Sequence, residues 1–512
     1  MIRKYALYCF LTFTVGLCAQ QGDEIPARKT QNGLFVIDFL PVEIPSTSAS
    51  VTEDDMGLTG LHYNLDFNNF YTGLGIYGAV SGERGGFFTL GINAGYRAFL
   101  GQHFFLDAGV HFGGGGGAAA PDGGGAFILP HLSLGLNFNR FALTGGYSHI
   151  NFFDGGKIRG EQLYLALQLP LKLQYASFAD AGKSFAPGQL KSSTWDRKPR
   201  RMSFMLHLNN LSVQGDSQDI LGVSLDDSTI RLAGFELNSY FGGNWLFFLK
   251  ADGAYDGIPA GYMNILLGAG HHFSLNKNRT NILAKFGVGA GGGGGVDTQG
   301  GVLIYPDISL EQHLFSNLYL AVNKGFLMSP NSHFIASTLG FGLKYYSDFN
   351  GVKTDYELTR SRFKAFEIIV KQDVVLDADR EMNPTENLFQ ISLQLNYLLS
   401  RNFYLAGQTS FANFGNAGAY AEGLVGPGLQ TNYFMNNSVN LFAQVLGGGA
   451  GGGDISTGEG LVVKPSAGLN LKLSDQLALR AAAGYLTATN GDLSSVFGNL
   501  GLSYRLSFLN SR

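Results

Sequence analysis

The chain has 512 residues and a formal net charge of −4, and charged residues make up 14% of it, against about 25% in ordinary soluble domains. Glycine accounts for 73 residues and aromatic residues for 13% of the chain. With a charge this close to neutral, nothing indicates a nucleic-acid partner, which would need a concentrated basic face. Low charge combined with abundant glycine and aromatic residues is typical of strands that meet lipid on one face.

The first residues form a segment typical of export. Arg3 and Lys4 give a short basic start, residues 5–17 are almost wholly apolar, and Ala19 offers a small residue for cleavage. This layout predicts a secretory signal peptide over residues 1–19. The mature chain would carry a formal charge of −6, because two cations leave with the signal and no acid does.

Cys9 and Cys18 are the only cysteines of the sequence, and both lie in the signal segment. Cys18 could accept a lipid anchor, but Leu17 before it is bulky where lipoprotein signals require a small residue, so ordinary cleavage is the preferred interpretation. The mature chain would then have no disulfide, no thiolate metal site and no cysteine nucleophile.

Beyond the signal, the strand pattern is an alternation of apolar and polar residues with a period of two. No run of about 18 apolar residues occurs there, so a membrane-spanning segment would have to be a strand of a closed barrel. Alternating segments with one pure apolar face include residues 61–68, 338–345, 389–397 and 499–508. A soluble β-sandwich also alternates, but the length of these faces and the terminal aromatic Phe508 favour a membrane barrel.

A repeat of about 165 residues is visible in three glycine-rich hairpins. Glycine runs occur at residues 113–117, 289–295 and 447–453. Each is followed by a strand that carries a proline at the same place, and these prolines lie 176 and 159 residues apart: Pro130, Pro306 and Pro465. Such self-similarity predicts three copies of one structural unit.

About eight strands are expected in each copy, with tight turns alternating with longer loops, as in barrels that have short periplasmic turns. In the first copy the strands are expected to begin near Phe35, Leu61, Thr72, Phe87, Phe104, Phe127, Phe141 and Gln162. Both ends of each copy then lie on the periplasmic side. The predicted organisation is a first repeat over 20–175, a periplasmic linker over 176–200, a second repeat over 201–346, a second linker over 347–364 and a third repeat over 365–512.

The expected fold class is therefore all-β: a transmembrane, antiparallel, up-and-down β-barrel protein, built as three tandem small barrels or as one ring of 24 strands. An eight-stranded barrel is just wide enough inside for side chains, and charges there must be paired. The long linkers favour three small barrels, and so do inward-facing charges that can pair inside each repeat and that nearly balance in the second. These charges are Glu236, Lys250, Asp252, Lys285, Asp307, Glu311, Lys344, Glu367, Lys371, Asp373, Lys464, Lys472, Arg480 and Arg505.

The glycine runs are expected to kink or flatten strand ends, or to form mobile loop tips. A phosphate-cradling loop would need a following lysine and a helix N-terminus, which these runs lack. His111 and His131 are expected to meet across the first glycine hairpin, with Asp107 nearby. A metal site would need three or more converging ligands, so a hydrogen-bonded lumen pair is predicted there, and no metal or cofactor is assigned.

The most enzyme-like stretch covers residues 146–156 and Glu161. Over about twenty residues it resembles the outer-membrane lipid A deacylases, which are eight-stranded barrels that use a histidine, a serine two residues later and a downstream acid. His149 and Glu161 match this pattern, but Asn151 stands in the place of the nucleophile and cannot form an acyl-enzyme. Ser148 would point to the other face of the strand. A strand end with interfacial polar residues is the preferred interpretation, and no catalytic residue is assigned.

The whole mature chain resembles the outer-membrane β-barrel superfamily of Gram-negative bacteria. The resemblance implies an exported outer-membrane protein, for which we predict a non-enzymatic envelope, adhesion or complex-scaffolding role. The expected partners are outer-membrane lipid and lipopolysaccharide, the outer-membrane assembly machinery and other envelope proteins. Two alternatives stay open: a porin-like transport pore, which requires the single wide ring, and a lipid A deacylase-like hydrolase.

Overall fold

The computed structural model describes residues 24–45, 53–352 and 360–511, and almost all of its regular structure is antiparallel strand. The predicted signal peptide, with Cys18, lies outside these residues. The only α-helix among them is the short α1 (Pro187–Leu190), so no described helix has the length and hydropathy to cross a membrane.

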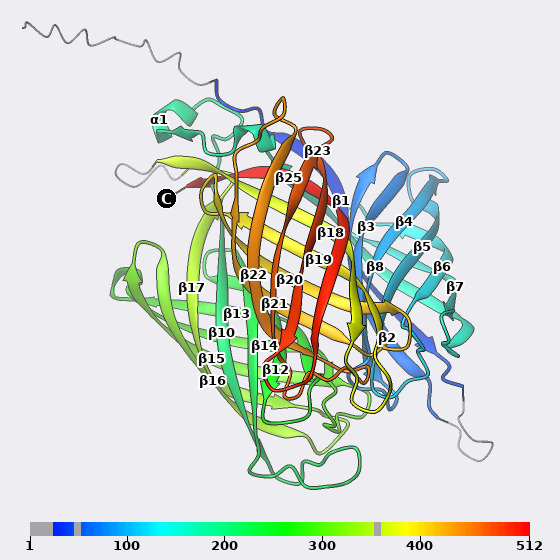
Figure 1. Cartoon of the computed structure of the whole chain (residues 1–512). Helices are drawn as coiled ribbons and strands as arrows, with labels where there is room; N and C mark the ends of the chain where they lie inside the picture. The colour runs from blue at the N-terminus through cyan, green and yellow to red at the C-terminus, as the bar shows by residue number, and fades with distance from the viewer. Residues whose placement is uncertain (1–23, 46–52, 353–359, 512) are drawn as a thin grey trace, which may run out of the picture.

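The first eight strands form a closed barrel, in which each strand pairs with its neighbour in sequence and β1 pairs with β8 (Figure 1). Successive strands can pair in this way because tight turns and loops join antiparallel neighbours directly. The strands are β1 (Lys29–Val42), β2 (Met56–Phe67), β3 (Phe70–Ser81), β4 (Phe88–Phe99), β5 (Phe104–Gly116), β6 (Phe127–Asn137), β7 (Ala142–Phe152) and β8 (Arg159–Tyr175).

The next set of eight strands closes in the same way, through a ladder of β10 with β17 from Arg200–Phe349 to Gln214–Ile335. Its strands are β10 (Arg200–Gln214), β11 (Thr229–Phe241), β12 (Trp245–Asp256), β13 (Met263–Leu275), β14 (Thr280–Gly292), β15 (Val302–Phe315), β16 (Leu318–Met328) and β17 (Ile335–Phe349).

The last eight strands close through a ladder of β18 with β25 that runs from Ser361–Ser511 to Val375–Phe497. They are β18 (Ser361–Ala378), β19 (Glu386–Leu398), β20 (Phe403–Phe414), β21 (Ala421–Gln430), β22 (Val439–Gly451), β23 (Leu461–Lys472), β24 (Leu477–Ala488) and β25 (Ser494–Ser511). A short ladder between β17 and β25 joins the second and third sets into one sheet.

These closures exclude the alternative of one 24-stranded ring among the described strands. A continuous ring would carry the ladder from one set of eight to the next and leave β1 and β8 unpaired with each other. Instead, β1 pairs with β8, β10 with β17, and β18 with β25. The connecting segment after β8 is long enough to let each set close first, because it carries η1 (Phe178–Asp180), β9 (Ser184–Phe185) and α1 before β10 begins.

Inside each barrel, a group of buried polar and charged side chains lies beside a buried apolar cluster, whereas the outer faces of the strands are mainly apolar. On β19, the side chains of Gln390, Ser392, Gln394 and Asn396 are 0% exposed, while Leu395 between them is 37% exposed. The other alternating segments share this pattern, so the apolar faces identified in the sequence surround each barrel. Such continuous apolar surface on a soluble protein would drive aggregation.

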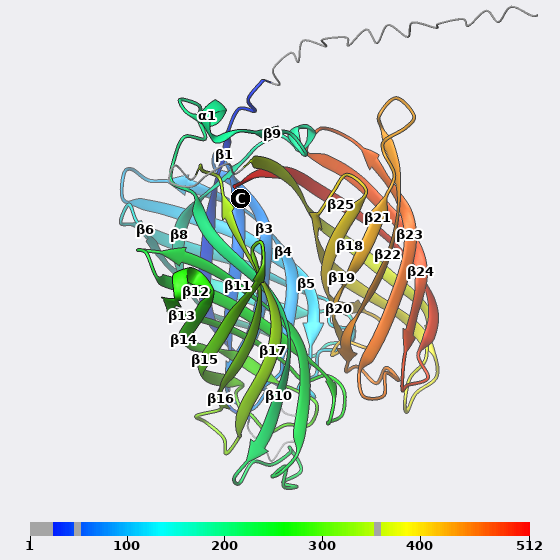
Figure 2. The same ribbon diagram turned by 90° about the vertical axis from the view of Figure 1, so that its left-hand side faces the viewer.

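The first part of each glycine run is the end of a strand and forms contacts between barrels, rather than the tip of a loop. Gly115 and Gly292 have a positive φ there, as expected for glycines that bend strand ends. Gly113–Gly116 pair along β4 as part of β5. At the end of the molecule opposite the linkers, β5 packs against β20 (Figure 2). In the same way, β22 packs against β12, and β14 against β3. We call the residues 113–116, 289–292 and 447–451 the glycine seam. Each barrel thus contributes its fifth strand to one neighbour and its third strand to the other.

One position of the glycine seam shows why small residues are required. Gly114, Ala290 and Gly449 each lie 16 residues before one of the strand prolines. A side chain on Gly114 would begin 2.5 Å from the Ala412 carbonyl oxygen of β20. Ala290 lies against Gly78 of β3 in the same way, and Gly449 lies against Ala254 of β12. Residues without bulk let the backbones of neighbouring barrels approach closely.

An apolar cluster continues this contact between the barrels. Phe88 and Leu90 of β4 pack with Ala290 of β14 and with Ile391 and Phe411 of β19 and β20. These side chains are on the outer faces of three different barrels, yet all are buried. The barrels are therefore held together by packing as well as by the covalent linkers.

The opposite end is held by a cluster of linker residues, which we call the linker cluster: Ala176, Phe185, Leu190, Trp195, Val352, Phe363 and Leu509. Trp195 is completely buried, and its indole N–H donates to the Pro26 carbonyl oxygen at 2.7 Å. Both connecting segments and the end of β25 meet in this cluster. The connection over 176–200 is consequently a packed element rather than an extended tether.

Replacing Gly114 by Ala tests the glycine seam. The added methyl group would overlap the β20 backbone, so we expect the variant to lose about 1–3 kcal/mol of stability. Urea titration of protein inserted in vesicles, followed by tryptophan fluorescence and heat-shifted gel mobility, measures this loss. Gly423→Ala is the matched control, because a methyl group on Gly423 meets nothing within 4 Å. Equal stability of the two variants would contradict the seam.

Candidate functional site

The second barrel holds a chain of alternating charges across its lumen. All seven residues that the sequence predicts here lie in the interior and are at most 5% exposed. Lys285 Nζ lies 2.6 Å from Glu236 Oε2 and 3.0 Å from Asp307 Oδ2. Lys344 Nζ lies 2.6 Å from Glu311 Oε1 and 3.8 Å from Glu236 Oε1. Opposite charges from four strands therefore neutralise one another within one lumen.

A second group in the same lumen joins Lys250 and Asp252 of β12 to a histidine that the sequence analysis did not single out. His207 Nε2 lies 2.5 Å from Asp252 Oδ1 and 2.7 Å from Lys250 Nζ. Lys250 also forms an ion pair with Asp252. His207 lies on β10, at a position that alternation assigns to the inside, so its inward direction was readable from the pattern.

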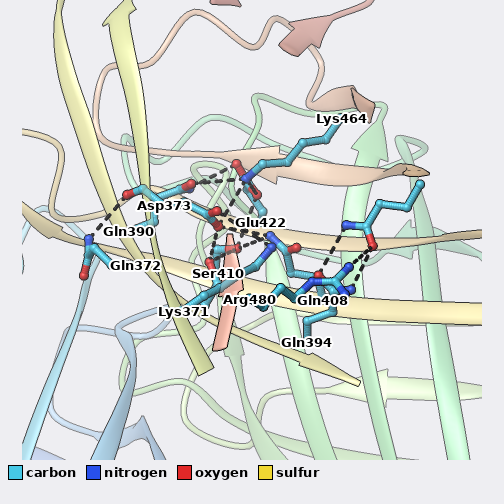
Figure 3. A network of polar contacts seen from close by, with 12 residues as sticks. Lys371, Gln372, Asp373, Gln390, Gln394, Gln408, Ser410, Glu422, Lys464 and Arg480 are labelled. Carbon is cyan, nitrogen blue, oxygen red and sulfur yellow. Dashed lines mark hydrogen bonds and ion pairs between the residues drawn. The ribbon is translucent and has the colours of Figure 1, made fainter. Parts of the chain in front are cut away.

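The third barrel contains a comparable network (Figure 3). Lys464 Nζ lies 2.9 Å from Glu422 Oε2 and 3.6 Å from Asp373 Oδ2. Lys371 Nζ approaches the other oxygen of Asp373 at 3.7 Å. Glu422 is absent from the sequence prediction, although Ala421 and Gly423 beside it face outwards and alternation would have found it.

The remaining charges of the third barrel are satisfied mainly by neutral groups. Arg480 donates to the Gln444 and Asn470 side chains at 3.0 and 3.1 Å, and its guanidinium lies over the Phe442 ring. Glu367 accepts from Asn396 at 2.8 Å. Arg505 donates to the Tyr433 hydroxyl and to the Ser474 carbonyl oxygen near the rim. Lys472 differs from the expectation, because it pairs with Asp475 in the turn at 2.7 Å rather than with a lumen group.

The first barrel uses histidine and tyrosine in place of lysine. His62 Nε2 lies 3.1 Å from Asp38 Oδ2, which also accepts from the Tyr77 hydroxyl at 3.0 Å. Asp107 accepts from the Tyr71 hydroxyl at 2.9 Å and lies 3.6 Å from His131 Nε2. The cavity left between these side chains measures about 30 Å³, which is room for a water or two but no open passage.

The predicted pairing of His111 with His131 is wrong, because each histidine has another partner. His111 Nδ1 lies 2.6 Å from Asn93 Oδ1, whereas His131 is directed to Asp107. Among the described residues, no group of three or more histidine, cysteine or acidic side chains is arranged to hold a metal ion. Asp38 and His62 were missed by the sequence analysis, although both alternate with outward-facing residues on their strands.

His149 and Glu161 are cross-strand neighbours on β7 and β8, as the deacylase pattern requires. Both side chains are on the outer side of the barrel, where Glu161 is exposed. No hydrogen bond joins them among the described residues. Ser148 points to the lumen instead and accepts from Gln162 at 3.0 Å. The structure therefore brings the histidine and the acid together, while the serine lies on the opposite face.

Asp122 is a buried acid in the loop after β5, where the first barrel meets the third. Its Oδ2 accepts from the Gly117 N–H at 2.8 Å, and Oδ1 lies beside Gly418. Burial raises the pKa of Asp122 to about 7, although the Gly117 N–H and the charge of Arg84 act in the opposite direction. Thr298 and Thr457 occupy the same place, eight residues before a strand proline. A protonated Asp122 is neutral, like the threonine hydroxyl groups at the equivalent positions.

Comparison with known proteins gives no assignment beyond the fold. No protein-family model and no curated protein matches the chain. Among solved structures, Pseudomonas aeruginosa OpdQ is 9% identical over 94% of this chain and 98% of its own, with a TM-score of 0.21. A ferric enterobactin receptor from P. aeruginosa is 9% identical over 94% of this chain and 82% of its own, with a TM-score of 0.26. The KdgM porin covers 59% of this chain and 98% of its own, at 7% identity and a TM-score of 0.15. Likeness at this level adds nothing to the argument from the structure itself.

Replacing Lys285 by Met tests the lumen network. The change leaves Asp307 and Glu236 without their shortest ion pairs in a lumen that excludes water, so we expect a loss of about 3–5 kcal/mol. Urea titration in vesicles measures it. Lys324→Met is the matched control, since Lys324 lies on the outer side of the same barrel. A loss below about 1 kcal/mol for Lys285→Met would contradict a charge-paired lumen.

The raised pKa of Asp122 predicts a pH dependence of stability. Since the folded protein holds this proton up to about pH 7 and the unfolded chain releases it near its ordinary value of 3.8, stability should fall as the pH rises between these values and level off above them. The fall should amount to a few kcal/mol on the order-of-magnitude scale of such shifts. Asp122→Thr should remove it, which urea midpoints at pH 5 and pH 8 would show. The same slope in both proteins would refute the assignment.

Proposed function

We propose that the chain is an integral outer-membrane β-barrel protein whose three barrels are closed to diffusion and which has a structural or complex-scaffolding role in the envelope. The observation that carries this proposal is the reversed alternation of its strands, with apolar side chains outside and paired polar side chains inside. Lipid is the solvent that favours such a surface, and closed barrels are the β-structures that satisfy all backbone groups in it.

The proposal includes the finer organisation that the sequence suggests, in which the three barrels are repeats of one eight-stranded unit. Its support is the equivalent position of the strand prolines, of Gly114, Ala290 and Gly449, and of Asp122, Thr298 and Thr457. The signal peptide would direct export, and the membrane-assembly machinery and outer-membrane lipid would be the first partners. The ends with the linkers would face the periplasm, because they carry the tight turns.

The main alternative is a transport channel, the kind of protein for which the KdgM porin is named. The physical argument for closed barrels is the width of an eight-stranded interior, which side chains fill. In the second and third barrels, the ion-paired residues occupy the middle of that interior. The support for a scaffolding role is the broad surface that three barrels present when they are packed side by side. The hydrolase alternative is not part of the proposal, because the nucleophile position is Asn151.

Reconstitution of the full mature chain in planar lipid bilayers tests this function. We expect heat-shifted gel mobility, which shows folded barrels, and no large stable conductance. A porin reconstituted under the same conditions serves as the positive control. Large, stable openings from protein with the heat shift would replace the scaffolding proposal by transport. A mature chain that stays soluble without detergent and shows no heat shift would refute the membrane location itself.

A further inference from the structure

Three cations project from the start of β18 on the outer side of the third barrel. Arg362 and Lys364 alternate on β18, so their side chains share one face of the strand. Arg360, the residue just before β18, lines the same pocket. Arg360 and Arg362 are exposed, and Lys364 is half-buried with its ammonium group 2.9 Å from the Leu399 carbonyl oxygen. Like charges on one face repel each other, so an anion in contact with the two exposed guanidinium groups would stabilise this arrangement.

These cations line a pocket of about 360 Å³, which is large enough for a small ligand. Its remaining walls are Ser184 of β9, Leu399 in the turn after β19, and Asn510 of β25. Arg362 is held at its centre, because its backbone pairs with Ser184 on one side and with Asn510 on the other. No carboxylate lines the pocket among the described residues. The pocket therefore combines positive charge, neutral hydrogen-bonding groups and one apolar wall.

The pocket lies where the outer surface changes from charged to apolar. The next outward residue on β18 is Phe366, whose ring centroid is 6.3 Å from that of Phe508. Phe508 in turn lies 6.1 Å from Phe349 of the second barrel. Aromatic residues form girdles at the membrane interfaces of such barrels. The cations lie just beyond these aromatic residues, on the side of the linkers. In the proposed membrane location, this is the height of the lipid headgroups.

We propose that this pocket binds the phosphate group of an anionic phospholipid in the periplasmic leaflet. Arginine is suited to phosphate because its planar fork can donate two parallel hydrogen bonds to two phosphate oxygens. The phosphate would lie between Arg360, Arg362 and Lys364, and the acyl chains would extend along Leu399 and Phe366 towards the apolar belt. The bound lipid would anchor the third barrel beside the linker cluster.

Lipid binding by the full mature chain in detergent, measured by native mass spectrometry, tests the site. The probes are dioleoyl phosphatidylglycerol, the zwitterionic dioleoyl phosphatidylcholine and inorganic phosphate. We expect tighter binding of phosphatidylglycerol than of phosphatidylcholine, and a loss of about tenfold or more in affinity for phosphatidylglycerol in Arg360→Gln/Arg362→Gln. Both substituted side chains are exposed, so folding should be unaffected. Inorganic phosphate at millimolar concentration should leave the lipid bound.

The matched control is Lys277→Gln/Arg279→Gln, which removes two exposed cations from a tight turn of the second barrel at the same end of the molecule. This variant should bind phosphatidylglycerol like the wild type. Equal losses in both variants, equal binding of the two lipids, or release of the lipid by inorganic phosphate would overturn the proposal. The inference rests on the proposed membrane location, and heat-shifted mobility of each protein separates a failed site from a failed barrel.

Discussion

The width of an eight-stranded ring is the constraint on which the rest of this structure depends. Such a ring leaves little space for water beside a charged side chain, so inward charges must be compensated by other groups of the lumen. The lumens meet this constraint in three chemically different ways. The second uses lysine with carboxylates, the third adds amides and arginine, and the first uses aspartate with histidine and tyrosine. One architecture thus tolerates different interiors, provided that the charged groups of each are compensated.

Alternation made much of the fold predictable from the sequence. Because a strand has a period of two, the list of inward charges followed from the apolar positions beside them, and the structure places Glu236, Lys285 and Lys344 within one lumen. The starts of β3 to β8 were also predicted to within three residues, whereas β1 and β2 begin six and five residues before the expected positions. The pairing of the inward groups could not be predicted. Partners such as His131 and Asp107 depend on the strand register around the barrel and on side-chain rotamers, which no local pattern encodes.

The glycine runs show the limit of a local interpretation most clearly. Taken alone, a run such as 113–117 indicates freedom of the backbone, which is why mobile tips were expected. In the structure the missing side chains serve a neighbour that is distant in sequence, since Gly114 lies against Ala412. Small residues on an outward face are thus a sign of tight contact between elements, as they are between helices in membranes. That meaning becomes visible only once the other barrel is in place.

The circular order of the seam has a consequence for assembly. The fifth strand of the first barrel contacts the last barrel, the last contacts the second, and the second contacts the first. In each contact the fifth strand of one barrel meets the third strand of another. Two barrels alone therefore leave one fifth-strand surface and one third-strand surface uncovered. Once two have docked, the third meets both at a high effective concentration, since the chain already tethers it at the far end. Closure of the circle should therefore be all-or-none, and a truncated chain would present its unused surface to another copy.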